Sequence, residues 1–575
     1  MQKTWKARTR DGQEAPEELA SQIAKGCGVS LRMARLLWLR GVDSPAEGNV
    51  YLDPRLRYLS SPRLWHGMAE AAGEIDRRLA EGGRLAIWGD YDVDGITGTA
   101  LALEVLRYHG ISASWHIPDR RTEGYGMNEA GVEALARQGI DILLTVDCGI
   151  SDEKAIARAR ELGMTVIVTD HHIPPQLLPP ATVICNPKVG GGPCLSLSGV
   201  GVIFYVMAEL NALLARRNGK KMDMRSVLDL VALGTLADLV ELEGQNRILV
   251  QNGLKILADA RRPGISELKA VCGFSPAAAL GAGQVVFSLA PRINAAGRMA
   301  SAQTALDLLL STDFDACRRL STMLDGYNSL RRQEEDKICE AAMLEAEQLP
   351  DDPAYVIAGD DWNQGVIGIV ASRIVEKFNK PAFVLCRDGA CLKGSGRSIE
   401  GFDLHAGLEL CANDLVGYGG HRMAAGIRVM PEKLEDFRRH FCEAVRGSLG
   451  SAPVPPVQYI DAELDFSGAS NFAFLKELGL LQPFGVGNPE PVFSVHSLII
   501  KKIRTFGIKK NHALLELADE SCGITLRAKA WRGADRFTSG MEGSRIDLAY
   551  TPSIDMYNGV ASVDIKIKDW RPANV

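Results

Sequence analysis

The sequence predicts an α/β protein built around a doubly wound, mostly parallel sheet, followed by a second α/β domain and a small β-barrel. From about residue 61, short apolar runs alternate with helix-like segments, which is typical of parallel strands covered by helices on both faces. A similar alternation starts at about residue 352. After a proline-rich linker at 451–457, short strand-like segments separated by glycine and charged turns indicate a barrel.

The 575 residues are enough for three or four domains. We expect a helical lead-in at 1–60, the first α/β domain at 61–300, a connecting helix at 301–349, the second α/β domain at 350–450 and the barrel at 451–575.

The individual elements follow from apolar runs and helix-like spacing. In the first α/β domain, strands are predicted at 84–89, 112–118, 141–147, 164–170 and 181–187, with helices at 98–110 and 153–163 and further helices over 200–260. In the second, strands are predicted at 354–359 and 381–386, with a closing helix at 431–445.

Composition is ordinary for a soluble globular protein, with 46% hydrophobic and 24% charged residues. The net charge of −6 excludes a global basic field, so any nucleic acid must be held by a local groove. The 12 cysteines form no C-x-x-C pair, and neither an export signal nor an apolar run of 18 residues is recognisable. We therefore expect a cytoplasmic protein with reduced thiols and no membrane partner.

Acidic and histidine side chains gather where buried strands are predicted to end. In a doubly wound sheet, sites form outside the carboxyl ends of the strands. Three segments have this position, and a further aspartate follows on a predicted helix. They are Asp90-Tyr91-Asp92-Val93-Asp94, Asp147, Asp170-His171-His172 and Asp238.

Each segment alone has an ordinary explanation. Asp147 could cap a helix, and the acidic turn resembles a calcium loop, although Leu101 stands where that loop requires glutamate. A His-His pair is often part of a polar loop. Together, however, these groups would repel one another at one sheet edge unless cations neutralise them.

The ligand types also indicate the metal. Several carboxylates with one or two imidazoles and no thiolate favour Mn²⁺ or Mg²⁺ over structural zinc. One carboxylate can bridge two ions roughly 3.5–4 Å apart, the usual arrangement for phosphoester hydrolysis. We therefore expect a two-metal phosphodiesterase.

An ordered series of motifs from about 84 to 493 resembles the DHH phosphoesterase superfamily, and within it the RecJ family of single-strand-specific 5′→3′ exonucleases. The matching segments are GDYDVDGITG, IPDRRTEGYGMN, TVDCGIS, VTDHHIPP, LSGVGV, ALGTLADLVEL, PRINAAGRM, GVIGIVASR, GSGRS, GGHRMAAG and PFGVGNPEPVF. The resemblance implies a DHH catalytic domain, a DHH-associated domain and a C-terminal OB-fold.

The resemblance also implies roles for the acids and histidines. Asp92 and Asp94 would each bind one metal, Asp147 would bridge the two ions, and His171 and Asp238 would bind the second ion. His172 would lie near the scissile phosphate, and Asp170 would support it. Several relatives outside this family carry a histidine at the position of Trp88. Here water or Asp90 could complete the first metal's ligand set, or Asp90 could only support the ligands.

Substrate-binding residues are implied in both α/β domains. Arg120 and Arg298 are candidates for binding the 5′ phosphate, although either could form an ordinary salt bridge. Gly394 to Ser398 would offer backbone amides, the Ser395 hydroxyl and the Arg397 guanidinium to a phosphate, unless the segment is only a glycine-rich turn. His421 would face the substrate or be structural.

In the barrel, a basic stretch and aromatic rings could hold a single strand, with cations along the backbone and rings stacked on bases. The alternative is a solvated turn. The residues are Lys501, Lys502, Arg504, Phe506, Lys509, Lys510, His512, Trp531 and Tyr550.

The function expected from the resemblance is processive hydrolysis of single-stranded DNA from its 5′ end, in recombination and repair, with single-strand-binding protein and a helicase as possible partners. Two alternatives remain at this point. One is a DHH phosphodiesterase of small substrates such as cyclic dinucleotides or oligoribonucleotides. The other is a non-catalytic single-strand-binding scaffold.

Overall fold

The computed structural model describes residues 3–120, 122–349, 351–450, 452, 454–557 and 560–573. Residues 451 and 453 of the predicted linker lie outside these ranges. The chain forms two compact units. Unit 1 comprises residues 1–5, 298–300 and 325–458, and unit 2 comprises residues 6–297, 301–324 and 459–575.

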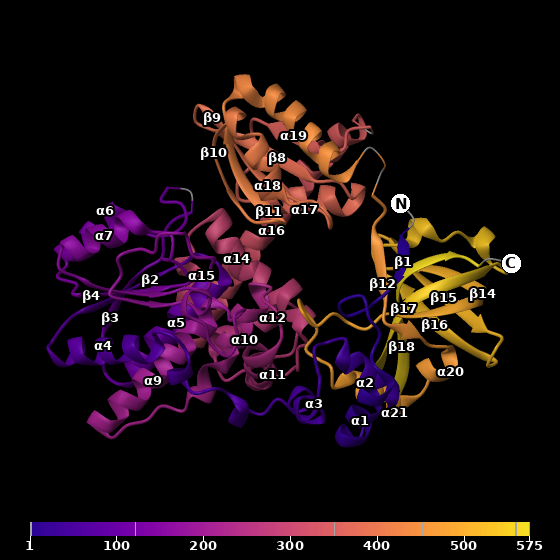
Figure 1. The fold of residues 1–575 in the computed structure, drawn as a ribbon, viewed down its shortest axis with the longest axis horizontal. Coiled ribbons are helices and arrows are strands. Elements are labelled where there is room, and N and C mark those ends of the chain that lie inside the picture. Colours follow the sequence, from indigo (N-terminus) through magenta and orange to yellow (C-terminus); the bar gives the residue numbers. More distant parts are fainter. Residues whose placement is uncertain are drawn as a thin grey trace. The chain divides into compact units, whose positions relative to one another are not determined.

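The first sheet of unit 2 confirms the predicted doubly wound architecture (Figure 1). All its strand pairs are parallel. The strand order is β3 (Ala113–His116), β2 (Leu85–Gly89), β4 (Ile142–Val146), β5 (Thr165–Thr169) and β6 (Val183–Cys185). The helices α6 (Glu129–Arg137) and α7 (Glu153–Glu161) cover one face, and α4 (Met68–Ala80), α5 (Val93–Tyr108) and α9 (Gly199–Asn218) cover the other.

Further helices extend this domain. They are α8 (Pro187–Gly190), α10 (Leu228–Ala237), α11 (Gly244–Asp259), α12 (Pro263–Val271), α13 (Ala282–Gln284), α14 (Ala290–Met299) and α15 (Gln303–Leu310). The long α16 (Phe314–Glu347) runs from unit 2 into unit 1. Although α9 is long and apolar enough to cross a membrane, 72% of its apolar window is buried inside the protein, and this burial accounts for its composition.

Helix α5 begins five residues earlier than predicted, inside the acidic turn. The reason is local, because the Asp92 carboxylate accepts hydrogen bonds from the backbone amides of Asp94 and Gly95 and caps the helix. The sequence prediction missed this because it treated the acidic turn as a loop before the helix.

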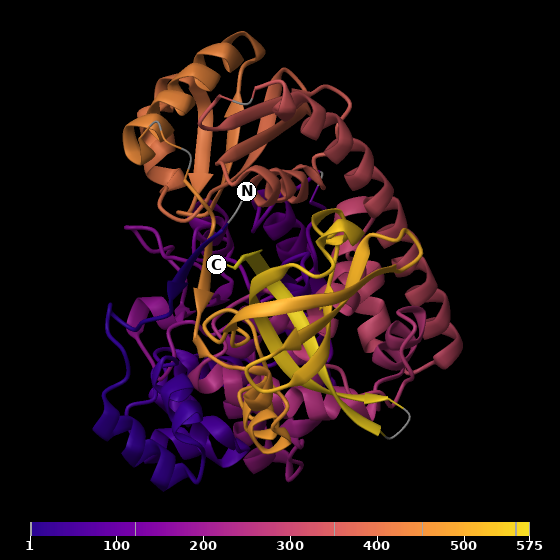
Figure 2. The same ribbon diagram turned by 90° about the vertical axis from the view of Figure 1, so that its right-hand side faces the viewer.

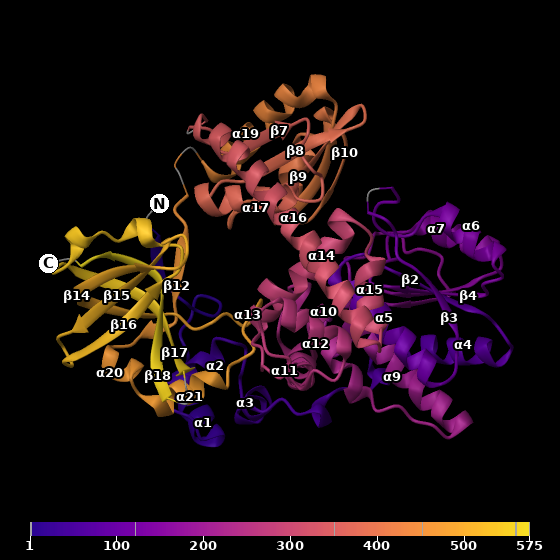
Figure 3. The same ribbon diagram turned by 180° about the vertical axis from the view of Figure 1, so that it is seen from behind.

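Unit 1 contains a mixed five-stranded sheet between helices (Figure 3). Helix α17 (Ile367–Phe378) packs with α16 on one face, and α18 (Leu404–Leu410) and α19 (Leu434–Leu449) pack on the other. The strand order is β10 (Leu415–Gly420), β11 (Ala424–Val429), β9 (Cys391–Arg397), β8 (Ala382–Asp388) and β7 (Tyr355–Gly359).

The C-terminal strands close into the expected OB-type barrel, which Figure 2 shows in yellow. The pairing of β14 (Phe493–Phe506) with β17 (Arg545–Tyr557) closes it. The prediction of short strands was wrong, because three of these strands have 13 or 14 residues. The elements are β13 (Ala462–Glu463), α20 (Phe466–Ala469), α21 (Phe472–Gly479), β14 (Phe493–Phe506), β15 (His512–Asp519), β16 (Ile524–Ala530), β17 (Arg545–Tyr557) and β18 (Val560–Pro572).

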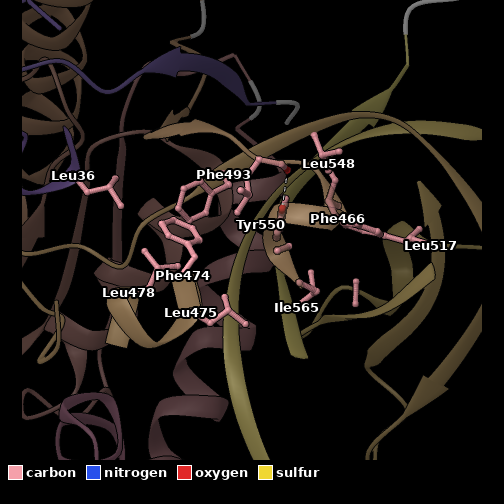
Figure 4. Packing of buried hydrophobic residues seen from close by; sticks show 14 of the residues in the cluster. Leu36, Phe466, Phe474, Leu475, Leu478, Phe493, Leu517, Leu548, Tyr550 and Ile565 are labelled. Carbon is pink, nitrogen blue, oxygen red and sulfur yellow. Dashed lines mark hydrogen bonds between the residues drawn. The ribbon is translucent and has the colours of Figure 1, made fainter. Parts of the chain in front are cut away.

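The N-terminal segment packs against this barrel and shares its hydrophobic core. Figure 4 shows Leu36 of α2 (Leu31–Trp38) in one cluster with Phe474 of α21 and Phe493 of β14. A two-stranded sheet of β1 and β12 adds a further link between the two ends of the chain. The N-terminal elements and β12 are β1 (Thr4–Ala7), α1 (Glu17–Cys27), α2 (Leu31–Trp38), α3 (Pro45–Leu52) and β12 (Val457–Ile460).

Within unit 2, the buried side chain of Arg247 on α11 joins three segments that are distant in sequence. Its guanidinium stacks on Tyr51, 3.9 Å from the ring centroid. It donates hydrogen bonds to four main-chain carbonyl oxygens, those of Tyr51, Leu480, Leu481 and Gln482. Planar guanidinium donors suit such a cluster of carbonyls.

We predict that Arg247→Met destabilises this junction by about 2–4 kcal/mol, because buried carbonyl oxygens lose their donors. Urea unfolding followed by tryptophan fluorescence would measure the loss. Arg261→Met is the matched control, because the Arg261 side chain is 80% exposed in a surface ion pair. Equal stability of the two variants would contradict the proposed role of Arg247.

Candidate metal centre and nucleic-acid interface

The predicted acids and histidines come together at the carboxyl edge of the unit 2 sheet. Three groups have ligand atoms within 4.8 Å of one another: Asp90, Asp92 and Asp147; Asp94, His171 and Asp238; and Asp147, His171 and His172. Asp147 and His171 each belong to two groups, which gives two adjacent ligand sets around a shared centre. Trp88, by contrast, is fully buried in the hydrophobic core beneath α6.

Asp147 lies at the end of β4 in a left-handed conformation with φ of 63°. A non-glycine residue seldom adopts this conformation, and it is found most often at functional sites. The alternative that Asp147 caps a helix is wrong, because Asp152 is the N-terminal cap residue of α7.

Space for Asp147 depends on Gly199 at the start of α9. A Cβ atom at Gly199 would lie 2.5 Å from Asp147 Oδ1 and 2.7 Å from its Cγ. The same helix end holds Asp94, whose two carboxylate oxygens accept hydrogen bonds from the backbone amides of Gly199 and Val200 at 2.7 and 2.9 Å. The helix N-terminus therefore stabilises one of the clustered charges.

Asp170 organises the loop that carries the two histidines. Its Oδ1 accepts hydrogen bonds from the amides of His171 and His172 and lies 2.7 Å from His172 Nδ1. Its Oδ2 accepts from the amide of Ile150. With Nδ1 bound to Asp170, Nε2 is the ring nitrogen of His172 that remains for a ligand.

Two residues that the sequence interpretation missed hold the histidine main chain in place. Asn186 donates from its amide nitrogen to the carbonyl oxygen of His172 at 2.9 Å, and Lys188 donates to the carbonyl oxygen of His171. Both residues follow strand β6, which ends at the same edge of the sheet as β4 and β5. The Asn-Pro-Lys sequence directly after this predicted strand could therefore have indicated them.

The electrostatics of this edge are those expected of crowded carboxylates without cations. Burial, followed by the neighbouring charge of Asp92, raises the pKa of Asp94 to about 7. Burial and the charges of Asp94 and Asp92 raise the pKa of Asp238 to about 9. Burial and like charges also raise the pKa of Asp147 and Asp90.

The two histidines differ in charge. Burial lowers the pKa of His171 to about 3, so the ring is neutral and able to bind a metal. For His172, burial disfavours the cation, but the hydrogen bond and charge of Asp170 outweigh burial and raise its pKa. A neutral His171 can bind a metal, and a protonated His172 beside it can bind an anion such as a phosphate.

Several buried polar atoms at this edge have no hydrogen-bond partner among the described residues. They are Asp90 Oδ1, Asp147 Oδ1 and both ring nitrogens of His171. His171 Nε2 lies 3.2 Å from Asp147 Oδ1, but the contact lacks hydrogen-bond alignment. Because buried polar atoms are normally satisfied, these atoms fit metal ligands. The donor set of carboxylates and imidazole suits Mn²⁺ or Mg²⁺.

Arg120 lies near the metal centre in unit 2. Its guanidinium carbon is 5.2 Å from the ring centroid of Tyr91, which places a cation beside the acidic turn. The described structure places the other candidates, Arg298, Ser395, Arg397 and His421, in unit 1.

Three of these unit 1 residues meet at the first turn of α17. Arg298 donates to the carbonyl oxygen of Gly365, just before the helix. A Cβ atom at Gly368 would lie 2.9 Å from Ser395 Oγ and 3.1 Å from Arg397 Nη2, so this glycine permits their close approach. First-turn amides lack intrahelical acceptors and favour anions.

The Gly394–Ser398 segment is not a phosphate-binding loop, and that part of the prediction was wrong. Residues 394–397 of this segment lie in β9, whose backbone pairs with β8 on one side and with β11 on the other. Its amides are therefore used by the sheet. The Arg397 guanidinium donates to Ser395 Oγ and to the Gly396 carbonyl oxygen, and no carboxylate of the described residues pairs with it. His421 is exposed in the turn between β10 and β11.

The barrel carries an exposed basic and aromatic surface. The rings of Phe506, His512 and Trp531 lie with centroids 4.9–5.5 Å apart, and Trp531 is 56% exposed. Lys501, Lys502, Arg504, Lys509 and Lys510 are exposed, and none forms an ion pair with a described acid. Tyr550 does not belong to this surface. It is fully buried and donates to the Leu464 carbonyl oxygen, so its predicted stacking role was wrong (Figure 4).

Family models match three parts of the chain. Residues 84–235 match the DHH family N-terminal domain, residues 352–447 match the DHHA1 domain, and residues 460–569 match the RecJ OB domain.

Full-length relatives agree with these matches. The chain is 34% identical over 562 residues to the single-stranded-DNA-specific exonuclease RecJ of Bacillus subtilis strain 168, covering 97% of this chain and 70% of that protein. The crystal structure of RecJ with Mn²⁺ from Thermus thermophilus superposes with a TM-score of 0.83 and 29% identity, covering 99% of this chain and 80% of that one. The Mg²⁺ complex from the same organism gives a TM-score of 0.77 at 27% identity, with coverage of 99% and 79%.

We predict that Gly199→Ala weakens Mn²⁺ binding at least tenfold, because the added methyl group displaces the Asp147 carboxylate. Isothermal titration calorimetry would measure the affinity. Gly73→Ala in α4 is the matched control, because its Cβ would meet nothing within 4 Å. Wild-type affinity in Gly199→Ala would show that Asp147 is not a ligand held in this position.

We also predict that stabilisation by Mn²⁺ increases with pH. In the metal-free protein, Asp94 and Asp238 keep protons up to about pH 7 and about pH 9, whereas their ordinary pKa is 3.8. The stability that these protons contribute is complete below pH 3.8 and is lost as pH rises through 7 and 9. Mn²⁺ replaces the protons, so the difference in Tm between Mn²⁺ and EDTA should be larger at about pH 8.5 than at about pH 5.5.

Differential scanning fluorimetry would measure this difference. In Asp238→Asn the pH dependence should be weaker, because one titrating ligand is removed. An equal Mn²⁺ effect at both pH values in the wild-type protein would contradict the assignment.

Proposed function

The chain belongs to the RecJ family of single-stranded-DNA-specific exonucleases, and on this premise we propose that its metal centre hydrolyses single-stranded DNA from the 5′ end. The protein is a metal-dependent exonuclease of single-stranded DNA with the DHH, DHHA1 and OB domains of that family. The observation that carries the proposal is a pair of ligand sets, one with Asp147 and one with His171, which the group of Asp147, His171 and His172 joins. Buried ligand atoms in these sets have no hydrogen-bond partner among the described residues.

Asp90, Asp92 and Asp147 would hold one divalent cation, and Asp94, His171 and Asp238 the other, with Asp147 shared between them. When bound, two such cations lower the pKa of a water molecule and neutralise the oxygens of a phosphodiester. Asp92 is suited to its position because its Oδ1 is already fixed by capping α5, which orients Oδ2.

His172 would contact the scissile phosphate through Nε2. Asp170 fixes the ring at Nδ1 and favours its protonated form, so the imidazole can donate a hydrogen bond to a phosphate oxygen. Asn186 supports the same geometry through the His172 carbonyl oxygen.

The unit 1 residues at the start of α17 would bind the 5′ phosphate. The Arg397 guanidinium, which pairs with no described acid, the Ser395 hydroxyl and the amides of Ile367 and Gly368 would form a set of anion donors. Arg298 would contribute through its position beside Gly365, and Arg120 would face the strand from unit 2. His421 is a further candidate for contact with the strand.

The barrel surface of Phe506, His512 and Trp531, with lysines that pair with no described acid, would hold the strand downstream. Base stacking on aromatic side chains tolerates any sequence, and the cations follow the backbone. This local surface explains how a chain of net charge −6 can bind DNA. We further propose processive action in the cytoplasm, in recombination and repair, with recruitment by single-strand-binding protein and a helicase.

We predict that Asp147→Ala lowers the rate of cleavage of a 5′-phosphorylated strand by more than about 10³-fold, because it removes the ligand shared by both metal sets. Strand binding measured by fluorescence anisotropy should change less than about threefold, since the barrel and α17 contacts remain. Asp223→Ala, which removes an exposed acid outside the three ligand groups, is the control.

A cyclic dinucleotide digested in parallel separates the alternatives. Turnover of only the cyclic dinucleotide by the wild-type protein would favour a small-substrate phosphodiesterase. Binding of the strand without cleavage in Mn²⁺ would favour a scaffold. Undiminished cleavage by Asp147→Ala would exclude Asp147 from the metal centre.

A further inference from the structure

Tyr125 lies at the rim of the metal centre with its hydroxyl directed inward. The hydroxyl donates to the main-chain carbonyl oxygen of Asp147 at 3.1 Å and lies 3.2 Å from His172 Nδ1. Yet 49% of the residue is exposed. The hydroxyl therefore fixes the ring to the centre while part of the ring remains open to solvent.

Two aromatic neighbours meet the ring of Tyr125 edge to face. Tyr91 meets it edge to face, with centroids 6.3 Å apart and planes at 80°. His172 meets it in the same way at 5.7 Å and 73°. Neither neighbour is stacked parallel on the ring, and about half of the residue, 49%, is exposed to a ligand.

The loop that carries Tyr125 is held firmly on both sides. Before it, Glu123 accepts hydrogen bonds from the His116 ring and the Asn128 amide at 2.9 and 3.0 Å. After it, the amide of Met127 donates to Asp152 Oδ2 at 2.8 Å. A ring held in advance loses little conformational entropy when a ligand stacks on it.

We propose that Tyr125 is a base-stacking residue, which receives the face of an unpaired nucleobase belonging to a nucleotide at the metal centre. This inference rests on the proposed function. A nucleobase is separated from its phosphate only by the sugar, so a ring in contact with His172 is within reach of the base when His172 contacts the phosphate.

Stacking on Tyr125 would contribute to selection of single strands. In a duplex, each base is paired and stacked between its neighbours, so it must be extracted before its face can meet the ring. In a single strand, the face is available, and every base offers one, so the contact is independent of sequence.

The alternative is that Tyr125 only supports Asp147 and His172 through its hydroxyl. The two roles use different atoms, so they can be separated by substitution. Tyr125→Phe removes the hydroxyl and keeps the ring, whereas Tyr125→Leu removes both. Tyr108→Leu is the matched control, because Tyr108 is 47% exposed and donates to a main-chain carbonyl oxygen, that of Lys221, at 3.1 Å, on the last turn of α5.

The experiment measures kcat/KM on 5′-phosphorylated strands that are intact or carry one abasic tetrahydrofuran residue at the first, second or third position. We expect Tyr125→Leu to lower kcat/KM on the intact strand by about 5–100-fold. At one of the abasic positions, the kcat/KM of the wild-type enzyme should fall by a similar factor. The kcat/KM of Tyr125→Leu should fall little further, because this variant has already lost the stacking contact. Tyr125→Phe should keep this discrimination, and Tyr108→Leu should behave like the wild type.

The proposal would be overturned if, at all three positions, removing the base lowered kcat/KM by the same factor in Tyr125→Leu as in the wild type. The effects of the substitution and of base removal would then be independent. So would loss of discrimination in Tyr125→Phe equal to that in Tyr125→Leu, which would assign the effect to the hydroxyl.

A second measurement does not depend on cleavage. A 2-aminopurine at the sensitive position, or at each of the three positions in turn, should be quenched when the strand binds in Ca²⁺, and Tyr125→Leu should abolish one quench. If the wild-type protein binds strands without cutting them, the proposed function fails, but this quench still tests the stacking. Equal quenching at every position in both proteins would overturn the stacking proposal.

Discussion

Crowding of buried carboxylates is the constraint on which the rest of the catalytic domain depends. Asp90, Asp94 and Asp147 are almost fully buried at one edge of the sheet, where like charges oppose one another. Without cations, such groups must hold protons, because an isolated buried charge is costly. The fold reduces the cost where it can, by directing the α9 N-terminus at Asp94 and by capping α5 with Asp92. The remaining charge is what divalent cations would neutralise.

Different parts of the fold carry the metal ligands, the anion donors and the surface for the strand. Metal ligands follow the ends of parallel strands, where backbone hydrogen bonding fixes their positions. Anion donors gather around the first turn of α17 in the other unit, and an aromatic and basic surface lies on the barrel. This division explains why the acidic overall charge is compatible with DNA as a substrate, since each contact with phosphate has its own local donors.

Periodicity and family motifs predicted the parallel sheet, the barrel and the residues that gather at the metal centre, because these depend on local patterns. What they could not predict depends on contacts between distant segments. Gly199 is required by the volume of Asp147, and Tyr550 is buried by the barrel's own closure, although it resembled a surface aromatic in the sequence. The Gly394–Ser398 segment has the composition of a loop but the register of a central strand, so its side chains rather than its amides remain available.

The most direct test of the account is anomalous diffraction from crystals of this protein soaked in Mn²⁺. The account predicts two manganese peaks, one among Asp90, Asp92 and Asp147 and the other among Asp94, His171 and Asp238, with Asp147 in contact with both. A single peak, or two peaks that do not share Asp147, would contradict a two-metal centre organised around that carboxylate.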